Sequence, residues 1–199
     1  MKFIEFCLMS LDKPILGNLS KYNYKVAIVE GIKKLSRAND LILIPRITRT
    51  NIEDLKVAPK NMVKVLKVRS NDDIKDPIRL RRIAHAISLT SEALLRLGRK
   101  SVEKLYNFDI PVELPLKSLL DAMESQKYLK GLVNIIKAVL RKNLEIIFTA
   151  CPSKPNEVIH PVMLISILEE LGITGTYALK SLTLTPLRVL RSVGYVIHV

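Results

Sequence analysis

The sequence predicts an α/β protein that folds as a compact, somewhat irregular TIM-like (β/α) barrel of mainly parallel strands, in one domain over residues 1–199. Seven short apolar runs rich in β-branched residues recur along the chain. Polar or amphipathic stretches with a helical pattern separate these runs, and no Gly- or Ser-rich linker divides the chain. Seven or eight βα units in one domain indicate a closed barrel. An open, doubly wound sheet is the alternative.

Each predicted strand is a run of six or seven residues. Glutamates interrupt three of the runs, at Glu5, Glu30 and Glu113, which is the pattern expected of side chains that point into a barrel or toward its rim. The runs are K-F-I-E-F-C-L from Lys2, K-V-A-I-V-E from Lys25, D-L-I-L-I-P from Asp40, M-V-K-V-L-K-V from Met62, A-H-A-I-S-L from Ala84, I-P-V-E-L-P-L from Ile110 and L-E-I-I-F-T from Leu144.

Two long amphipathic stretches between these runs predict helices. The first covers residues 91–105, with Ser91 as its N-cap. The second covers residues 128–142 and carries an apolar stripe from Leu129 to Leu140, with lysine and arginine on its other faces.

The last predicted strand leads into a helix from Pro161 to about Leu171, which ends at G-I-T-G. A pair of short helices, T-Y-A-L-K-S-L and T-P-L-R-V-L-R-S-V, follows it. We expect Thr185 to cap the second of these, with Pro186 at its first position.

Composition favours an anionic partner. Lys and Arg number 32 against 19 Asp and Glu, a formal charge of +13. A charge that large on a compact domain points to nucleic acid, and a charged but merely solvated surface is the alternative. Aromatic residues make up only 5%, so backbone recognition in folded RNA is favoured over base stacking on an aromatic platform.

The two cysteines and the apolar runs indicate the cellular compartment in which the protein works. Cys7 and Cys151 are far apart in the sequence and form no disulfide framework and no C-x-x-C site, which predicts a reducing cytoplasm. Glu5 within the first apolar run argues against a signal peptide, and no run approaches the length of a membrane span.

No set of residues predicts catalysis by the polypeptide or a metal site within it. None of His85, His160 and His198 forms a metal-binding pair, and His160 at a loop-to-helix junction fits a helix cap. Cys151 has no identifiable base beside it and is interpreted as a small, half-buried residue. Acid–base chemistry by the three strand glutamates stays open, because a barrel would let them converge.

Basic residues concentrate where a nucleic acid would be held. The segment from Lys56 to Arg82 contains nine lysines and arginines but only three aspartates. The predicted loops after the strands add others, and Lys and Arg at loop tips suit phosphate contacts. The loop cations are Arg46, Arg49, Arg69, Lys117 and Lys154.

The segment from Thr149 to Pro161, T-A-C-P-S-K-P-N-E-V-I-H-P, followed by V-M-L-I-S-I-L, resembles the protein component 3 family of ribonuclease P from archaea and eukaryotes. In that family a strand ends in a T-S-S-A-like loop before a proline and a helix closed by glycine. The segment V-E-L-P-L-K-S-L-L from Val112 is similar to its F-S-x-R-P-L-L, and V-R-S-N-D from Val68 to its E-S-N-D. Four further positions match its A-K-x-S-x-S-x-x-P ending: Ala178, Ser181, Thr183 and Pro186.

This resemblance implies a TIM-like barrel and a non-catalytic, RNA-binding subunit of ribonuclease P, the ribonucleoprotein that removes the 5′ leader of precursor tRNA. It implies that the RNA holds the catalytic Mg²⁺. It also implies a smaller α/β protein subunit as partner, in a heterotetramer, and only indirect contact with precursor tRNA.

The resemblance carries some contact residues over and loses others. Lys117 stands where the family has a basic residue, whereas Ile159, Met163 and Leu179 replace polar or charged family residues. We expect compensation nearby, so the predicted RNA-binding set is Lys117, Lys180, Arg69, Lys154, His160, Arg46, Arg49, Arg79 and Arg82. A metal-dependent phosphoesterase of related barrel form and a protein-interaction scaffold with incidental charge are the rival hypotheses.

Overall fold

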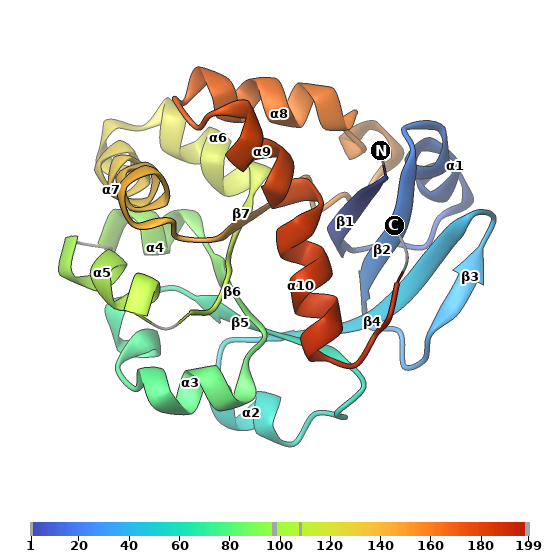
Figure 1. The fold of residues 1–199 in the computed structure, drawn as a ribbon, viewed down its shortest axis with the longest axis horizontal. Coiled ribbons are helices and arrows are strands. Elements are labelled where there is room, and N and C mark those ends of the chain that lie inside the picture. The colour runs from blue at the N-terminus through green and yellow to red at the C-terminus, as the bar shows by residue number, and fades with distance from the viewer. Residues whose placement is uncertain (1, 97–98, 108, 198–199) are drawn as a thin grey trace.

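Parallel strands follow one another around a barrel in the computed structural model, which describes residues 2–96, 99–107 and 109–197. Every pairing along the main path is parallel, and the strand order follows the sequence without reversal (Figure 1). The path runs through β1 (Phe3–Leu8), β2 (Tyr24–Glu30), β4 (Leu41–Arg49), β5 (Val63–Val68), β6 (Ala86–Leu89), β7 (Val112–Pro115) and β8 (Ile146–Thr149).

The barrel is nearly closed. β1 and β8 are neighbours in space, although no strand pairing joins them within the described residues. All seven predicted strands are present, so the TIM-like barrel is confirmed. The doubly wound alternative is wrong, because its strand order would reverse direction part-way along the sheet.

One strand was not predicted. β3 (Ser36–Ala38) pairs antiparallel with the first part of β4. Its sequence S-R-A has no apolar alternation and its residues are mostly exposed, so nothing in the sequence separates it from a loop.

Two apolar layers hold the barrel together. Small and branched residues such as Ile28, Ile44 and Val65 fill the interior, whereas residues of opposite alternation such as Ala27 and Leu43 pack beneath the outer helices. The last helix, α10 (Leu184–Ser192), contributes Leu187 and Leu190 to the interior cluster and covers the amino end of the barrel. The carboxyl end lies opposite it.

The helices form the outer wall (Figure 1). Two short 3₁₀ turns, at Asn71–Ile74 and Pro155–Glu157, lie in loops after β5 and β8. The remaining helices are α1 (Lys13–Lys21), α2 (Ile52–Lys56), α3 (Pro77–Ile83), α4 (Ser91–Arg96), α5 (Arg99–Asn107), α6 (Leu116–Glu124), α7 (Gln126–Lys142), α8 (Pro161–Glu170) and α9 (Gly175–Leu182).

The predicted helix over residues 91–105 is two helices, α4 and α5. Its predicted cap was wrong by one position, because the Thr90 hydroxyl, not that of Ser91, accepts the hydrogen bond from the Ala93 amide at 3.1 Å. The Ser91 hydroxyl instead donates to Asp121 on α6.

The stripe predicted for α7 is only half buried. Leu132 and Val139 are buried, but Leu129 and Leu140 are exposed, because the face against α4 is centred on Ile135. Gly131 permits this packing: a Cβ there would lie 1.8 Å from the Leu94 carbonyl oxygen.

The final helix starts earlier than predicted. α10 begins at Leu184 after Thr183, so Thr185 is a buried residue of the first turn and not the cap.

Candidate nucleic-acid interface at the carboxyl end of the barrel

An ion-pair network fills the carboxyl end of the barrel interior. Arg46 on β4 donates from Nη1 to Glu113 Oε1 at 2.6 Å and from Nη2 to Oε2 at 2.7 Å. Its Nη1 also donates to the Phe6 carbonyl oxygen at 2.7 Å, and the guanidinium lies 5.4 Å from the centre of the Phe6 ring. Arg46 and Glu113 are 2% and 0% exposed, so the pair is excluded from solvent.

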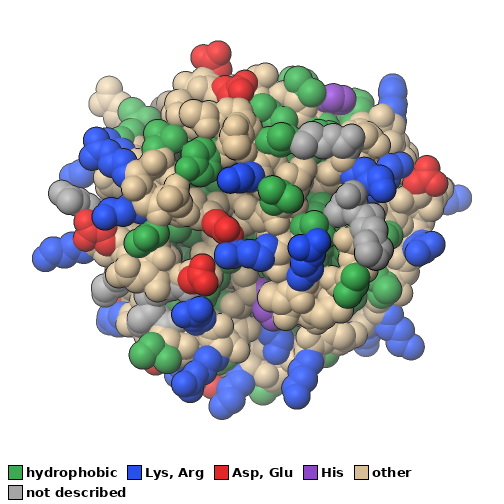
Figure 2. Space-filling view, viewed as in Figure 1, with side chains coloured by type: hydrophobic (Ala, Val, Ile, Leu, Met, Phe, Trp, Pro, Cys, Tyr) green, Lys and Arg blue, Asp and Glu red, His purple; other side chains and the backbone are tan. Residues whose placement is uncertain are grey.

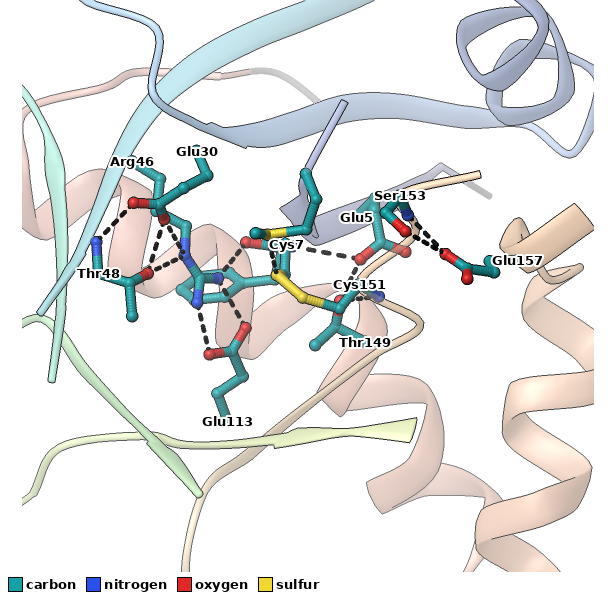
Figure 3. Close-up of a disulfide and its surroundings, with 12 residues drawn as sticks. Glu5, Cys7, Glu30, Arg46, Thr48, Glu113, Thr149, Cys151, Ser153 and Glu157 are labelled. Atoms are coloured by element: carbon teal, nitrogen blue, oxygen red, sulfur yellow. Dashed lines mark hydrogen bonds and ion pairs between the residues drawn. A yellow bond between two sulfur atoms is a disulfide. The ribbon is translucent and has the colours of Figure 1, made fainter. Parts of the chain in front are cut away.

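A second carboxylate completes the network. Arg46 Nε donates to the Thr48 hydroxyl at 3.0 Å, and this hydroxyl donates to Glu30 Oε2 at 2.7 Å. Glu30 Oε1 accepts from the Thr48 amide at 2.9 Å (Figure 3). β2 and β4 bring these groups together because Glu30 is directly opposite Arg46 in their register.

The network satisfies Arg46 from all sides. Burial opposes its charge, but attraction to Glu113, the hydrogen bonds to that carboxylate and attraction to Glu30 together raise the pKa of Arg46. Arg46 is therefore a buried residue of β4, and its predicted placement as a cation at a loop tip is wrong. A guanidinium held between two carboxylates occupies the place where a barrel enzyme would put its reacting groups.

A second cluster joins the first strand to the last, and we call it the β1–β8 seam. Cys7 and Cys151 form a disulfide across it, and the Met9 amide donates to the Pro152 carbonyl oxygen at 3.1 Å. This bond was not predicted, since two cysteines alone make no disulfide framework in the sequence. They are 144 residues apart in the sequence, and only closure of the barrel brings them together.

Glu5 belongs to this seam and not to the Arg46 network. Its carboxylate accepts from the Thr149 hydroxyl and, at 3.2 Å, from the Cys7 amide, on the far side of the disulfide from Arg46 (Figure 3). Burial raises the pKa of Glu5 to about 7, against the opposing effect of these hydrogen bonds. The three strand glutamates thus divide into two structural clusters.

Exposed cations surround the mouth above these clusters. Parallel strands place their carboxyl ends at one end of the barrel, so the loops after them form one rim. Arg49 ends β4, Arg69 follows β5, Lys117 is in the first turn of α6 after β7, and Lys154 is in the loop after β8. We call these four the rim cations; all are exposed, and none has an ion pair within the residues that the structure describes.

Carboxylates fix the backbone of two rim loops. Asp73 accepts from the Arg69 amide at 2.7 Å and from the Ser70 amide at 3.0 Å. Glu157 accepts from the amides of Ser153, at 2.7 Å, and Lys154, at 3.1 Å, and the Ser153 amide leads the hydrogen bonds that lower its pKa. Each loop therefore presents its cation from a backbone that is already ordered.

The other predicted contacts lie away from the rim cations or have structural partners. His160 caps α8, with Nδ1 accepting from the Val162 amide at 3.2 Å. Arg79 on α3 pairs with Glu53 on α2, and Arg82 is exposed in the last turn of α3. Lys180 lines a cavity with Lys2, just before β1, which places it toward the amino end.

The two histidines in the described ranges, His85 and His160, have separate structural roles. His85 accepts the Lys64 amide hydrogen bond on Nδ1 at 2.9 Å, and burial, with the nearby Lys64 charge, lowers its pKa to about 4. His198 lies outside the described residues. Across the described ranges no group of three or more His, Cys, Asp or Glu could hold a metal ion.

Sequence reasoning missed two further cations of the same end. Lys33 and Lys34 follow β2 and are exposed. The available signal was the Lys-Lys pair that follows the predicted strand after Gly31 and Ile32. Positive charge is nevertheless not confined to this end, because Figure 2 shows Lys and Arg side chains around the outline of the opposite face as well.

Comparison with solved structures shows a similar fold. The chain matches a chain of a cryo-EM structure of archaeal ribonuclease P with mature tRNA, with a TM-score of 0.73 and 14% sequence identity, over 98% of this chain and 97% of that chain. The crystal structure of an uncharacterized protein matches with a TM-score of only 0.45 and 10% identity, over 88% of this chain and 46% of that chain.

No protein-family model and no curated protein matches the sequence. The described part of the chain contains no helix that is long and apolar enough to cross a membrane.

Proposed function

We propose that this chain is an RNA-binding protein subunit of ribonuclease P and supports RNA-catalysed removal of the 5′ leader from precursor tRNA. The observation that carries the proposal is the match along almost the whole length of both chains to a component of an archaeal ribonuclease P structure. The sequence resemblance around Thr149–Pro161 points to the same complex.

The carboxyl end of the barrel supports this function in two ways. The rim cations supply unpaired positive charge on ordered loops, which suits RNA phosphates. The interior beneath them is closed by the Arg46 network, which offers no free acid–base pair. Bond cleavage therefore belongs to the RNA, whose Mg²⁺ we do not assign to any residue of this chain.

We also propose the partners that follow from this role. The chain contacts ribonuclease P RNA directly and precursor tRNA indirectly, and it pairs with a smaller α/β protein subunit in a heterotetramer. A cytoplasmic location follows from these partners. It no longer rests on the cysteines, since these form a disulfide.

Gel-shift titration of ribonuclease P RNA tests the proposal. Affinity should fall steeply with salt, because each phosphate contact releases counterions. Absent or salt-independent binding, both alone and with the smaller subunit, would contradict it.

The rival hypothesis is a metal-dependent phosphoesterase. The observation that favours it is the presence of two carboxylates, Glu30 and Glu113, inside the barrel. Both carboxylates are engaged by Arg46 or Thr48. The rival predicts that purified protein hydrolyses a generic phosphoester with Mn²⁺ or Zn²⁺ and stops when chelator is added. A third possibility, the interaction scaffold, predicts tight binding to protein without affinity for RNA.

A further inference from the structure

A groove runs between α5 and α7 on the outer wall of the barrel. These two helices pack side by side (Figure 1), and the cavity between them is about 480 Å³. Val102 of α5 and Ala138 of α7 are buried and form its floor. The volume lies within the ~300–1,000 Å³ of small-ligand sites.

The α7 side of the groove is cationic. Lys137, Arg141 and Lys142 line it, with Glu103 as the carboxylate on the α5 side. Asn134, Lys137 and Arg141 are spaced i, i+3 and i+7, so they form one row along the helix. Figure 2 shows Lys and Arg side chains gathered over this part of the wall, at the left of the view.

Some cations on other helices are neutralised by carboxylates. Arg79 and Arg188 have carboxylate partners. Within the described ranges no ion pair involves Lys137, Arg141 or Lys142. Their charge is therefore available to an external anion. Basic residues near the carboxyl end of a helix also stabilise that helix, which is the structural role these cations have without a ligand.

The groove also holds an unusual aromatic residue. Tyr106 of α5 is 43% exposed, and no other aromatic side chain in the described part of the chain is exposed to this degree. It shares the groove with the side-chain amides of Asn107 and Asn134. An exposed ring beside cations and amides matches how proteins hold unpaired nucleotides, with the ring against a base and the cations on phosphates.

From these observations we infer that the α5–α7 groove binds a single-stranded segment of RNA, at a second contact site on the barrel wall apart from the rim cations. Lys137 and Arg141 contact successive phosphates, and Tyr106 stacks on an unpaired base. This inference rests on the proposed function, because it assumes that the chain binds RNA. It adds to that function the form of RNA that is bound, a single strand, and the place where it binds, the α5–α7 groove.

The test compares charge reversals on one helix. Lys137→Glu with Arg141→Glu removes the groove cations, and Lys127→Glu with Lys130→Glu makes the same charge change at exposed residues of α7 that do not line the groove. The probe is a single-stranded oligouridylate, with duplex RNA for comparison. The groove pair should lose two phosphate contacts, which reduces the slope of log affinity against log salt by about 1.4. The control pair should keep most of the slope of the unaltered chain.

Tyr106 gives an independent measurement. Tyr106→Leu should weaken oligouridylate binding about five- to hundred-fold, whereas Tyr106→Phe keeps the ring and most of the affinity. Ultraviolet crosslinking of the unaltered chain to the oligouridylate should attach RNA at Tyr106. This readout does not depend on whether a variant folds, and circular dichroism checks the variants themselves.

The outcomes separate this inference from the proposed function. Equal weakening by the groove pair and the control pair, or equal competition by an acidic peptide, would overturn the groove as an RNA site. Binding lost only on reversal of Lys117 and Lys154 would leave the proposed function standing without the groove. No binding of any RNA by any form would remove both.

Discussion

Arg46 on β4 and Glu113 on β7, three strands apart in chain order, form two parallel N–H···O hydrogen bonds of 2.6 and 2.7 Å inside the barrel. They are 67 residues apart in the sequence and almost fully buried. The pair determines what this end of the barrel can do, because it occupies the interior with a satisfied charge and leaves recognition to the loops above.

Breaking this pair from one side should destabilise the protein. Arg46→Met leaves Glu113 buried without its cation, which costs about 3–5 kcal/mol in comparable sites. Urea unfolding should show this loss. Arg46→Met combined with Glu113→Leu should recover most of the lost stability, since two apolar groups replace the pair. A single variant within about 0.5 kcal/mol of the unaltered protein would contradict the network.

Glu5 should make stability depend on pH. Its folded pKa of about 7 is above the ordinary value of 4.5, so the folded state binds this proton more tightly. The resulting stabilisation is complete below about pH 4.5 and is lost as pH rises through 7. Relative to Glu5→Gln, the free energy of unfolding should therefore fall by on the order of 3 kcal/mol across that range.

Urea titrations of both proteins at a series of pH values measure this difference directly. Glu5→Gln is the suitable control because its side-chain oxygen can still accept from Thr149 and Cys7. A difference that stays flat, or rises with pH, would show that Glu5 is not buried as a protonated acid.

The disulfide should contribute substantially to closure of the barrel. Cys7 and Cys151 enclose a long loop, and such a crosslink typically stabilises by about 2–5 kcal/mol. A reducing agent should lower the stability of the unaltered chain by that amount and leave the Cys7→Ser, Cys151→Ser double variant unchanged. Two titratable thiols in native protein kept under oxidising conditions would contradict the bond.

Charge reversal should separate the two ends of the barrel. Lys117→Glu with Lys154→Glu should weaken binding of ribonuclease P RNA and reduce its salt slope by roughly 1.4 to 1.8. Lys180→Glu with Arg191→Glu makes the same charge change toward the amino end and should have the smaller effect. Filter-binding titrations over a salt series measure both. An equal effect would show that the rim cations have no special role.

The barrel could be predicted because each strand has a local sequence pattern. Runs such as K-V-A-I-V-E carry their own β-branched residues, and the helical stretches between the runs favour parallel neighbours. β3 was missed because three exposed residues have no such pattern. The cap was placed at Ser91 because serine is the more favoured cap residue, although Thr90 beside it can also cap a helix.

The site was predicted less well, since its contacts are not local. Arg46 looks like any loop cation at the end of an apolar run, and only the register of β2 with β4 and the position of β7 show that it is buried. The Cys7–Cys151 bond likewise depends on closure of the barrel. The exposed rim cations could be predicted because the position of a cation in the loop after a strand follows once that strand has been located.

Cleavage of precursor tRNA by reconstituted ribonuclease P, with and without this chain, tests the central claim most directly. With ribonuclease P RNA and the smaller protein subunit present, adding the chain should raise the cleavage rate, and reversal of Lys117 and Lys154 should abolish most of that gain. The chain without RNA should cleave nothing. Cleavage by the protein alone, or a rate that does not respond to its addition, would contradict a role as the RNA-binding support of an RNA catalyst.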